Sequence, residues 1–467
     1  MKNLFTFITI FNFFTIFSQD ITGSWSGKLK IQGIELRLVF NIQKADDGYK
    51  STMDSPDQGA NGIPISETKL EGDQLTISAK NLGIEYVAKV IDSKELKGQF
   101  KQGGQSFEMN MTKSDTKTTS LAKPQEPTQF DSYYSEEVTV LNKVDNLTLS
   151  ATLTLPKKKG NFPVVILISG SGPQNRDCEI LGHKPFLVIS DYLTKNGIAV
   201  LRFDDRGTGK STGDFKTAIT SDFTKDVSSI ITYLKTRKEI NSSQIGLIGH
   251  SDGGLVASMV AANNTSVSFV VLLAAPGVKG SELLLKQQAL IGLSSGVSVE
   301  EIAKSQEENK KVFDLIITST DQQKLISDIT SLVEEGVEKM AESDLPNGMT
   351  KKDFVSFQLQ QITSPWMISF IKSNPSEYLQ QIKCPVLALI GMLDLQVAYK
   401  ENLSGIENAL KAGENNRCII KGYEGLNHLF QHALTGNPSE YATIQETFSE
   451  EVLKDMLEWI KGMDLKN

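Results

Sequence analysis

The feature that most constrains this chain is a series of short, almost unbroken apolar runs separated by stretches of helical character. Runs of Val, Ile and Leu without polar alternation indicate strands buried on both faces, as in a parallel sheet covered by helices. The pattern therefore predicts a doubly wound, mostly parallel α/β domain over residues 129–467. The runs lie at residues 164–169, 199–203, 245–248, 269–273, 386–390 and 418–420.

One long stretch interrupts this alternation. Residues 279–375 carry almost no strand signal and are rich in Glu, Lys, Gln and Leu. Several amphipathic helices fit this composition best. Because ligands bind beyond the carboxyl ends of the strands in open α/β sheets, we expect this insertion to form a helical cap over that edge.

The N-terminal part has a period-two pattern instead. Apolar residues from Ile34 to Ile42 alternate with mostly polar neighbours, which is the signal of half-buried strands. Residues 20–113 are therefore expected to form a small all-β domain, a closed barrel or a sandwich. The motif GSWSG at residues 23–27 resembles the start of lipocalin-like barrels. Residues 114–128 are polar and proline-containing, and we expect a linker there.

The first 18 residues have the pattern of a signal peptide. A charged start is followed by an apolar stretch at residues 4–17 and the small residue Ser18. The alternative is an N-terminal anchor that is never cleaved. We expect an exported protein, periplasmic or secreted, without stable membrane insertion.

Composition excludes several other classes of function. The formal net charge of −8 would repel a phosphate backbone, so nucleic acid is not an expected partner. The chain has three cysteines, Cys178, Cys384 and Cys418, too few for a disulfide framework and without metal-ligand spacing. Cys384 and Cys418 adjoin apolar runs and are expected to be buried.

The pattern Gly-x-Ser-x-Gly occurs around Ser211, Ser251 and Ser294. A serine nucleophile of this kind requires a strand that runs directly into a sharp turn and a turn that runs directly into a helix. Ser251 meets this requirement, whereas Ser211 follows a six-residue loop and Ser294 has no strand before it. Ser251 is the predicted nucleophile, and the other two are expected to be loop or cap serines.

A serine hydroxyl needs a base to remove its proton, and the chain has four histidines, His183, His250, His428 and His432. His428 follows the last apolar run after a short Gly-rich loop, which places it at the same sheet edge as the nucleophile. His432 gives an H-x-x-x-H spacing with His428, but no Glu follows His428, so a zinc-peptidase motif is not formed. His428 is therefore the predicted base, and no metal is expected.

The orienting acid and the oxyanion hole are predicted from their positions after the apolar runs. Asp394 comes just after the run at residues 386–390 and is the predicted orienting acid. The resulting order Ser, Asp, His is that of α/β-hydrolases. The backbone N–H groups of Asp252 and Ser171 are the predicted oxyanion hole. The alternative for the loop that holds Ser171 is a plain turn.

Six segments in this order resemble the capped bacterial α/β-hydrolases usually described as carboxylesterases. The resemblance covers residues 138–461 and implies the same triad, on Ser251, Asp394 and His428. The strand before the oxyanion loop of that family often ends in His-Gly, and here it ends in Ser169-Gly170. The segments are SGSGPQNRD, GHKPFLVISDYLTKNGIAVLRFDDRGTGKSTGDF, IGLIGHSDGG, SPWM, CPVLALIGMLDLQV and LNHLFQ.

The predicted function is therefore hydrolysis of carboxylic esters, small or polymer-linked, through an acyl-enzyme and without a cofactor. The alternatives are a serine peptidase or aminopeptidase with the same triad, and a non-catalytic binding protein on a hydrolase scaffold. Trp366 and Phe370 lie four residues apart on one helical face. They are expected to form a wall of the substrate pocket, or else to pack the cap on the sheet. The sequence leaves the oligomeric state open.

Overall fold

A computed structural model describes residues 20–31, 34–45, 48–55, 60–79, 83–102, 105–114, 123–128, 132–341, 345 and 350–463. These residues divide into two compact units. The first holds almost all of the described residues up to 114, and the second holds everything from Lys123 onward. The predicted signal peptide and residues 115–122 of the predicted linker lie outside the described residues.

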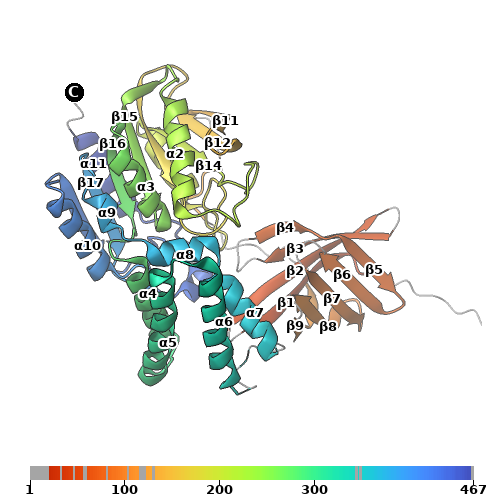
Figure 1. Ribbon diagram of the computed structural model, residues 1–467. Helices are drawn as coiled ribbons and strands as arrows, with labels where there is room; N and C mark the ends of the chain where they lie inside the picture. The colour runs from red at the N-terminus through yellow and green to blue at the C-terminus, as the bar shows by residue number, and fades with distance from the viewer. Residues whose placement is uncertain are drawn as a thin grey trace, which may run out of the picture. The chain divides into compact units, whose positions relative to one another are not determined.

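The first unit is a curled antiparallel sheet in the order β4-β3-β2-β1-β10-β8-β7-β6-β5, with β9 paired to β8 (Figure 1). The curl brings the hydroxyls of Ser51 and Thr68, in β3 and β5, into a hydrogen bond. The pairing order leaves β4 and β5 as the ends of one sheet, so the unit is a half-barrel and neither the closed barrel nor the sandwich that were expected. Pro64 at the end of β4 has no N–H to offer a further strand. The strands are β1 (Gly23–Ile31), β2 (Ile34–Ala45), β3 (Gly48–Ser55), β4 (Ala60–Pro64), β5 (Glu67–Glu71), β6 (Gln74–Ala79), β7 (Ile84–Val90), β8 (Glu95–Gln102), β9 (Gln105–Glu108) and β10 (Met111–Ser114).

The second unit is built on an eight-stranded sheet in the order β11-β12-β14-β13-β15-β16-β17-β18. The first two strands form an antiparallel hairpin, β12 pairs antiparallel with β14, and the pairings from β14 through β18 are parallel. The expected mostly parallel α/β sheet is therefore present. Its strands are β11 (Tyr134–Asn142), β12 (Leu147–Leu155), β13 (Phe162–Ile168), β14 (Ala199–Phe203), β15 (Ile240–His250), β16 (Val267–Leu273), β17 (Val386–Gly391) and β18 (Cys418–Tyr423).

Helices cover both faces of this sheet, which explains the buried apolar runs of β13, β16 and β17. One apolar cluster joins the sheet to α1 and α11, and a second joins it to α2, α3 and α10. Figure 1 shows α2 and α3 lying along the same face. These helices are α1 (Pro185–Lys195), α2 (Thr220–Leu234), α3 (Asp252–Asn263), α10 (Tyr399–Ala412) and α11 (Glu450–Gly462).

A helical insertion separates β16 from β17, within the stretch for which helices were expected. Ser298 and Glu301 form a capping box that starts α5, and Ser364 caps the N-terminus of α8. No helix of the described ranges is both long and apolar enough to cross a membrane. The helices between the two strands are α4 (Gly280–Ser294), α5 (Val299–Thr318), α6 (Gln322–Glu338), α7 (Lys351–Ile362), α8 (Pro365–Lys372) and the short α9 (Ser376–Leu379).

The structure differs from the sequence-based expectations at two smaller features, the cysteines and the predicted linker. Cys178 is buried, whereas Cys384 and Cys418 are only half-buried, and all three are free thiols. Residues 123–128 of the predicted linker pack on the second unit: Lys123 donates to the carbonyl oxygen of Ile444, and Gln125 donates to that of Phe448.

Candidate active site

Ser251 occupies a sharp turn between the end of β15 at His250 and the start of α3 at Asp252. Its backbone has a φ of 54° and a ψ of −126°. A residue with a β-carbon rarely adopts positive φ, so this turn stores strain of the kind found in nucleophile elbows. The N–H of Ser251 donates to the carbonyl oxygen of Leu273 over 2.8 Å, which ties the turn to β16.

Two glycines make the turn possible. A β-carbon at Gly249 would lie 2.2 Å from the carbonyl oxygen of Gly253, and one at Gly253 would lie 2.2 Å from that of Ile168 in β13. Both distances are far below van der Waals contact, so a larger residue would not fit at either position. The Gly-x-Ser-x-Gly spacing around Ser251 is therefore a steric requirement of this turn.

The structure brings His428 and Asp394 together. The distance between Nδ1 of His428 and Oδ2 of Asp394 is 2.8 Å, and both side chains are buried. The other carboxylate oxygen, Oδ1, accepts from the backbone N–H groups of Gln396 and Val397, each over 2.8 Å. These bonds fix the carboxylate beyond β17, within hydrogen-bonding distance of Nδ1 of His428.

His250 links the turn to His428. Its Nε2 donates to the carbonyl oxygen of His428 over 2.9 Å, and the two ring centroids are 4.8 Å apart. Burial and, to a smaller extent, the nearby His428 lower the pKa of His250 to about 3, so the ring is neutral near pH 7. No hydrogen bond joins Ser251 to His428 in the described part of the chain. Such bonds are often long before substrate binds.

The amino-acid sequence places His250 within the Gly-x-Ser-x-Gly pattern and indicates no further role for it. Its contact is with a backbone carbonyl group 178 residues further along the chain. No sequence pattern marks a bond to a backbone group at that separation, so only the fold shows it.

The loop after β13 lies directly against the turn. A β-carbon on Gly170 would lie 3.1 Å from Cβ and 3.6 Å from Oγ of Ser251. The amides of Ser171, which follows Gly170, and of Asp252, which follows Ser251, donate no hydrogen bond to any other described group. Two such N–H groups next to a serine at a sharp strand-to-helix turn are an arrangement typical of oxyanion holes.

Two adjacent carboxylates hold this loop in place. Asp205 accepts from the Ser169 hydroxyl over 2.9 Å and from the backbone N–H of Gln174 over 3.0 Å. Asp204 accepts from the backbone N–H of Arg176 over 2.9 Å and from its guanidinium over 2.8 Å. Burial raises the pKa of Asp205 to about 8. Burial also acts on Asp204, but hydrogen bonds from Arg176 outweigh it and keep the pKa of Asp204 below its usual value.

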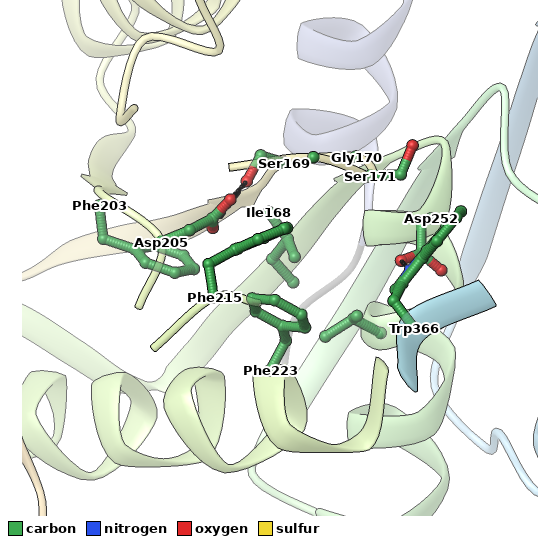
Figure 2. Close-up of a pocket in the computed structure, with 12 residues that line it drawn as sticks. Ile168, Ser169, Gly170, Ser171, Phe203, Asp205, Phe215, Phe223, Asp252 and Trp366 are labelled. Atoms are coloured by element: carbon green, nitrogen blue, oxygen red, sulfur yellow. Dashed lines mark hydrogen bonds between the residues drawn. The ribbon is translucent and has the colours of Figure 1, made fainter. Parts of the chain in front are cut away.

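A narrow cavity lies beside this loop and the start of α3 (Figure 2). Its free volume is about 10 Å³, room for the centre of roughly one water molecule. The indole Nε1–H of Trp366, in α8, donates to Oδ2 of Asp252 over 2.9 Å. Burial raises the pKa of Asp252 to about 6, although the bond from Trp366 opposes this. The cavity is lined by Ile168, Ser169, Gly170, Ser171, Gly172, Phe203, Asp205, Phe215, Phe223, Asp252, Val256 and Trp366.

Of the two residues predicted as a pocket wall, only Trp366 is among these lining residues. Phe370 is buried, and its ring stacks on Trp366 with centroids 5.1 Å apart and an interplanar angle of 23°. Phe370 therefore does not line the cavity but packs against the ring of Trp366, which does.

The other candidate side chains have structural partners. The Ser211 hydroxyl donates to the carbonyl oxygen of Asp204, and the Ser294 hydroxyl accepts from Asn437. His183 is buried against the carbonyl oxygen of Tyr441, and the exposed His432 pairs with Glu446. Within the described ranges, no three His, Cys, Asp or Glu side chains are grouped so that they could hold a metal ion.

The strand order and the strained serine between β15 and α3 define an α/β-hydrolase. The chain belongs to the family described as serine aminopeptidase, S33, which matches residues 185–432. The esterase EstD of Thermotoga maritima is 24% identical over 284 residues, which are 60% of this chain and 58% of that relative. The match thus spans less than two thirds of the relative's length.

Solved structures are similar to this chain at low sequence identity. The Pyrococcus furiosus esterase Pf2001 has a TM-score of 0.44 at 19% identity, over 74% of this chain and 98% of its own. The alpha/beta hydrolase GrgF from Penicillium sp. sh18 has a TM-score of 0.41 at 17% identity, over 70% of this chain and 98% of its own.

Proposed function

We propose that this protein is a serine hydrolase that cleaves carboxylic esters through an acyl-enzyme intermediate. The observation that carries the proposal is the buried pair of His428 and Asp394, 2.8 Å apart, linked through His250 to the strained turn at Ser251. The similarity to the esterase EstD supports an ester as the substrate.

In the proposed reaction, Oγ of Ser251 attacks the ester carbonyl carbon while Nε2 of His428 takes its proton. Asp394 stabilises the imidazolium that forms, because its carboxylate accepts the Nδ1–H bond. The oxyanion accepts hydrogen bonds from the backbone N–H groups of Ser171 and Asp252. The N–H of Asp252 lies at the positive end of the α3 dipole. The alcohol leaves with the proton from His428. A water molecule then gives its proton to Nε2 of His428 and attacks the acyl carbon, and Oγ of Ser251 leaves as it takes that proton back, which releases the carboxylic acid.

We also propose that the helices α4–α8 act as a cap over this site. The support is the bond from Trp366 in α8 to Asp252 at the start of α3, which joins the insertion to the residue after the nucleophile. A cap of this kind excludes water and selects substrates by shape.

An aminopeptidase is the second candidate. The family description names this activity, and Oδ1 of Asp252 is buried without a hydrogen-bond partner among the described residues. A carboxylate oxygen in this position would pair with the amino group of a peptide substrate.

The test is to compare p-nitrophenyl esters with aminoacyl p-nitroanilides as substrates of the purified protein. Ester cleavage that Ser251→Ala lowers by about 10⁴-fold or more supports the esterase. The control is Ser294→Ala, which changes a serine of the same sequence pattern on α4 and is expected to retain full activity. Preference for the anilides favours the aminopeptidase. A Ser251→Ala protein that retains a tenth of the activity contradicts both, and no turnover of any substrate favours a binding protein.

The apolar N-terminal sequence leads us to propose further that the protein is exported. Fractionation of cells that express the full-length gene, with and without residues 2–18, tests this directly. Equal retention of both proteins inside the cell contradicts it.

A further inference from the structure

The cavity beside the loop after β13 adjoins the two residues whose amides are proposed to bind the oxyanion. Ser171 and Asp252 each contribute to its lining. A carbonyl oxygen bound to those amides places the carbonyl carbon at Ser251, so the acyl substituent must extend past the same two residues. The cavity is the space that the structure provides there.

The free volume of this cavity is small and its inner walls are rigid. About 10 Å³ is available, which fits one group of the size of water or methyl. The inner walls include Ile168, Phe203, Phe223 and Val256, each less than 9% exposed and packed in the apolar core. Moving any of them would disrupt a close-packed interior, so the cavity cannot easily grow on that side.

Among the lining residues, Trp366 is the one that the helical insertion contributes. Its indole N–H donates to Asp252 over 2.9 Å, and its ring stacks on Phe370, which is 4% exposed. Figure 2 shows Trp366 and Asp252 side by side at the edge of the cavity. A longer acyl chain must therefore displace a ring that is held both by a hydrogen bond to a carboxylate and by stacking.

We propose that this cavity is an acyl subsite for acetyl-sized groups, and that Trp366 is the residue that sets the size limit. The inference rests on the proposed esterase function and deepens it by naming the substrate class: esters of acetic acid and similarly short acids. Asp252 acts as a positioning residue for Trp366 through its side chain.

The test measures kcat/KM for p-nitrophenyl acetate, butyrate, hexanoate and octanoate. The wild type is expected to lose about tenfold or more from acetate to hexanoate, because even one methylene that does not fit a pocket costs about tenfold. Trp366→Ala is expected to raise the hexanoate-to-acetate ratio by about tenfold or more. Phe357→Ala, which removes an exposed aromatic ring from α7 of the same insertion, is the matched control and should keep the wild-type ratio.

The outcomes separate the subsite from the esterase function. Ester hydrolysis that shows no preference for acetate, or a Trp366→Ala protein that loses the same factor on every ester, overturns the subsite and leaves the proposed function standing. Failure of the wild type to cleave any ester, together with failure of a fluorophosphonate to label Ser251, overturns the proposed function and the subsite with it.

Discussion

The two neighbouring carboxylates that hold the oxyanion loop are expected to respond to pH in opposite ways. The informative change is Asp205→Asn. Asparagine keeps the shape of the side chain, its oxygen can accept from the N–H of Gln174, and its amide can donate to the hydroxyl of Ser169. The loop contacts are therefore retained, and only the titration of Asp205 is removed.

The magnitude follows from the pKa of Asp205, which burial raises from 3.8 to about 8. The folded-state pKa lies above the unfolded value, so the stabilisation is complete below the unfolded pKa and is lost as pH rises through the folded pKa. Between pH 5 and pH 8 the unfolded chain has released this proton and the folded chain has kept it. At about 1.4 kcal/mol per pH unit, the wild type loses about 4 kcal/mol over this interval that the Asn variant does not lose.

The assay is urea unfolding at pH 5, 6, 7 and 8, followed by circular dichroism at 222 nm. All helices of the described residues lie in the second unit, so this signal reports on the unit that contains Asp205. Asp205→Asn is expected to gain in stability relative to the wild type as the pH rises.

Asp204→Asn is the matched control, since the pKa of Asp204 is lowered by its bonds to Arg176. This variant is expected to be less stable than the wild type at pH 5 to 8, because the guanidinium of Arg176 loses its charged partner. Parallel stability curves for Asp205→Asn and the wild type would refute the reasoning.

Two further predictions concern the base and the chain between the units. Asp394→Asn should lower kcat for p-nitrophenyl acetate by about 10⁴-fold with little change in KM, because His428 loses the acceptor that fixes its tautomer; a kcat within tenfold of the wild type would contradict the triad. A chain that begins at Lys123 should cleave soluble esters at the full-length rate, and one that begins at Gln129 should have a lower Tm. The difference in Tm is expected because the shorter chain loses the hydrogen bonds from Lys123 and Gln125 to the carbonyl oxygens of Ile444 and Phe448. Equal Tm values for the two shortened chains would contradict this reason. A chain that begins at Lys123 and folds but does not hydrolyse esters would contradict the expected activity.

The parallel sheet could be predicted because its signal is local. Strands that are covered on both faces are apolar at most positions, so the apolar runs within β13 to β18 are visible in the sequence. The turn at Ser251 was equally predictable, since its glycines at positions 249 and 253 satisfy a steric requirement within five residues. The half-barrel was only partly predictable, because alternation shows that strands exist and does not show whether the two end strands pair.

The amino-acid sequence by itself therefore determined the class of the fold and the order of the candidate residues Ser251, Asp394 and His428. Tertiary structure alone decided which groups support them. The bond from His250 to the carbonyl oxygen of His428, the bonds from the loop after β13 to Asp205, and the bond from Trp366 to Asp252 each join positions far apart in the chain. Periodicity and turn chemistry act over a few residues, whereas these contacts depend on how separate strands and helices meet in the folded protein.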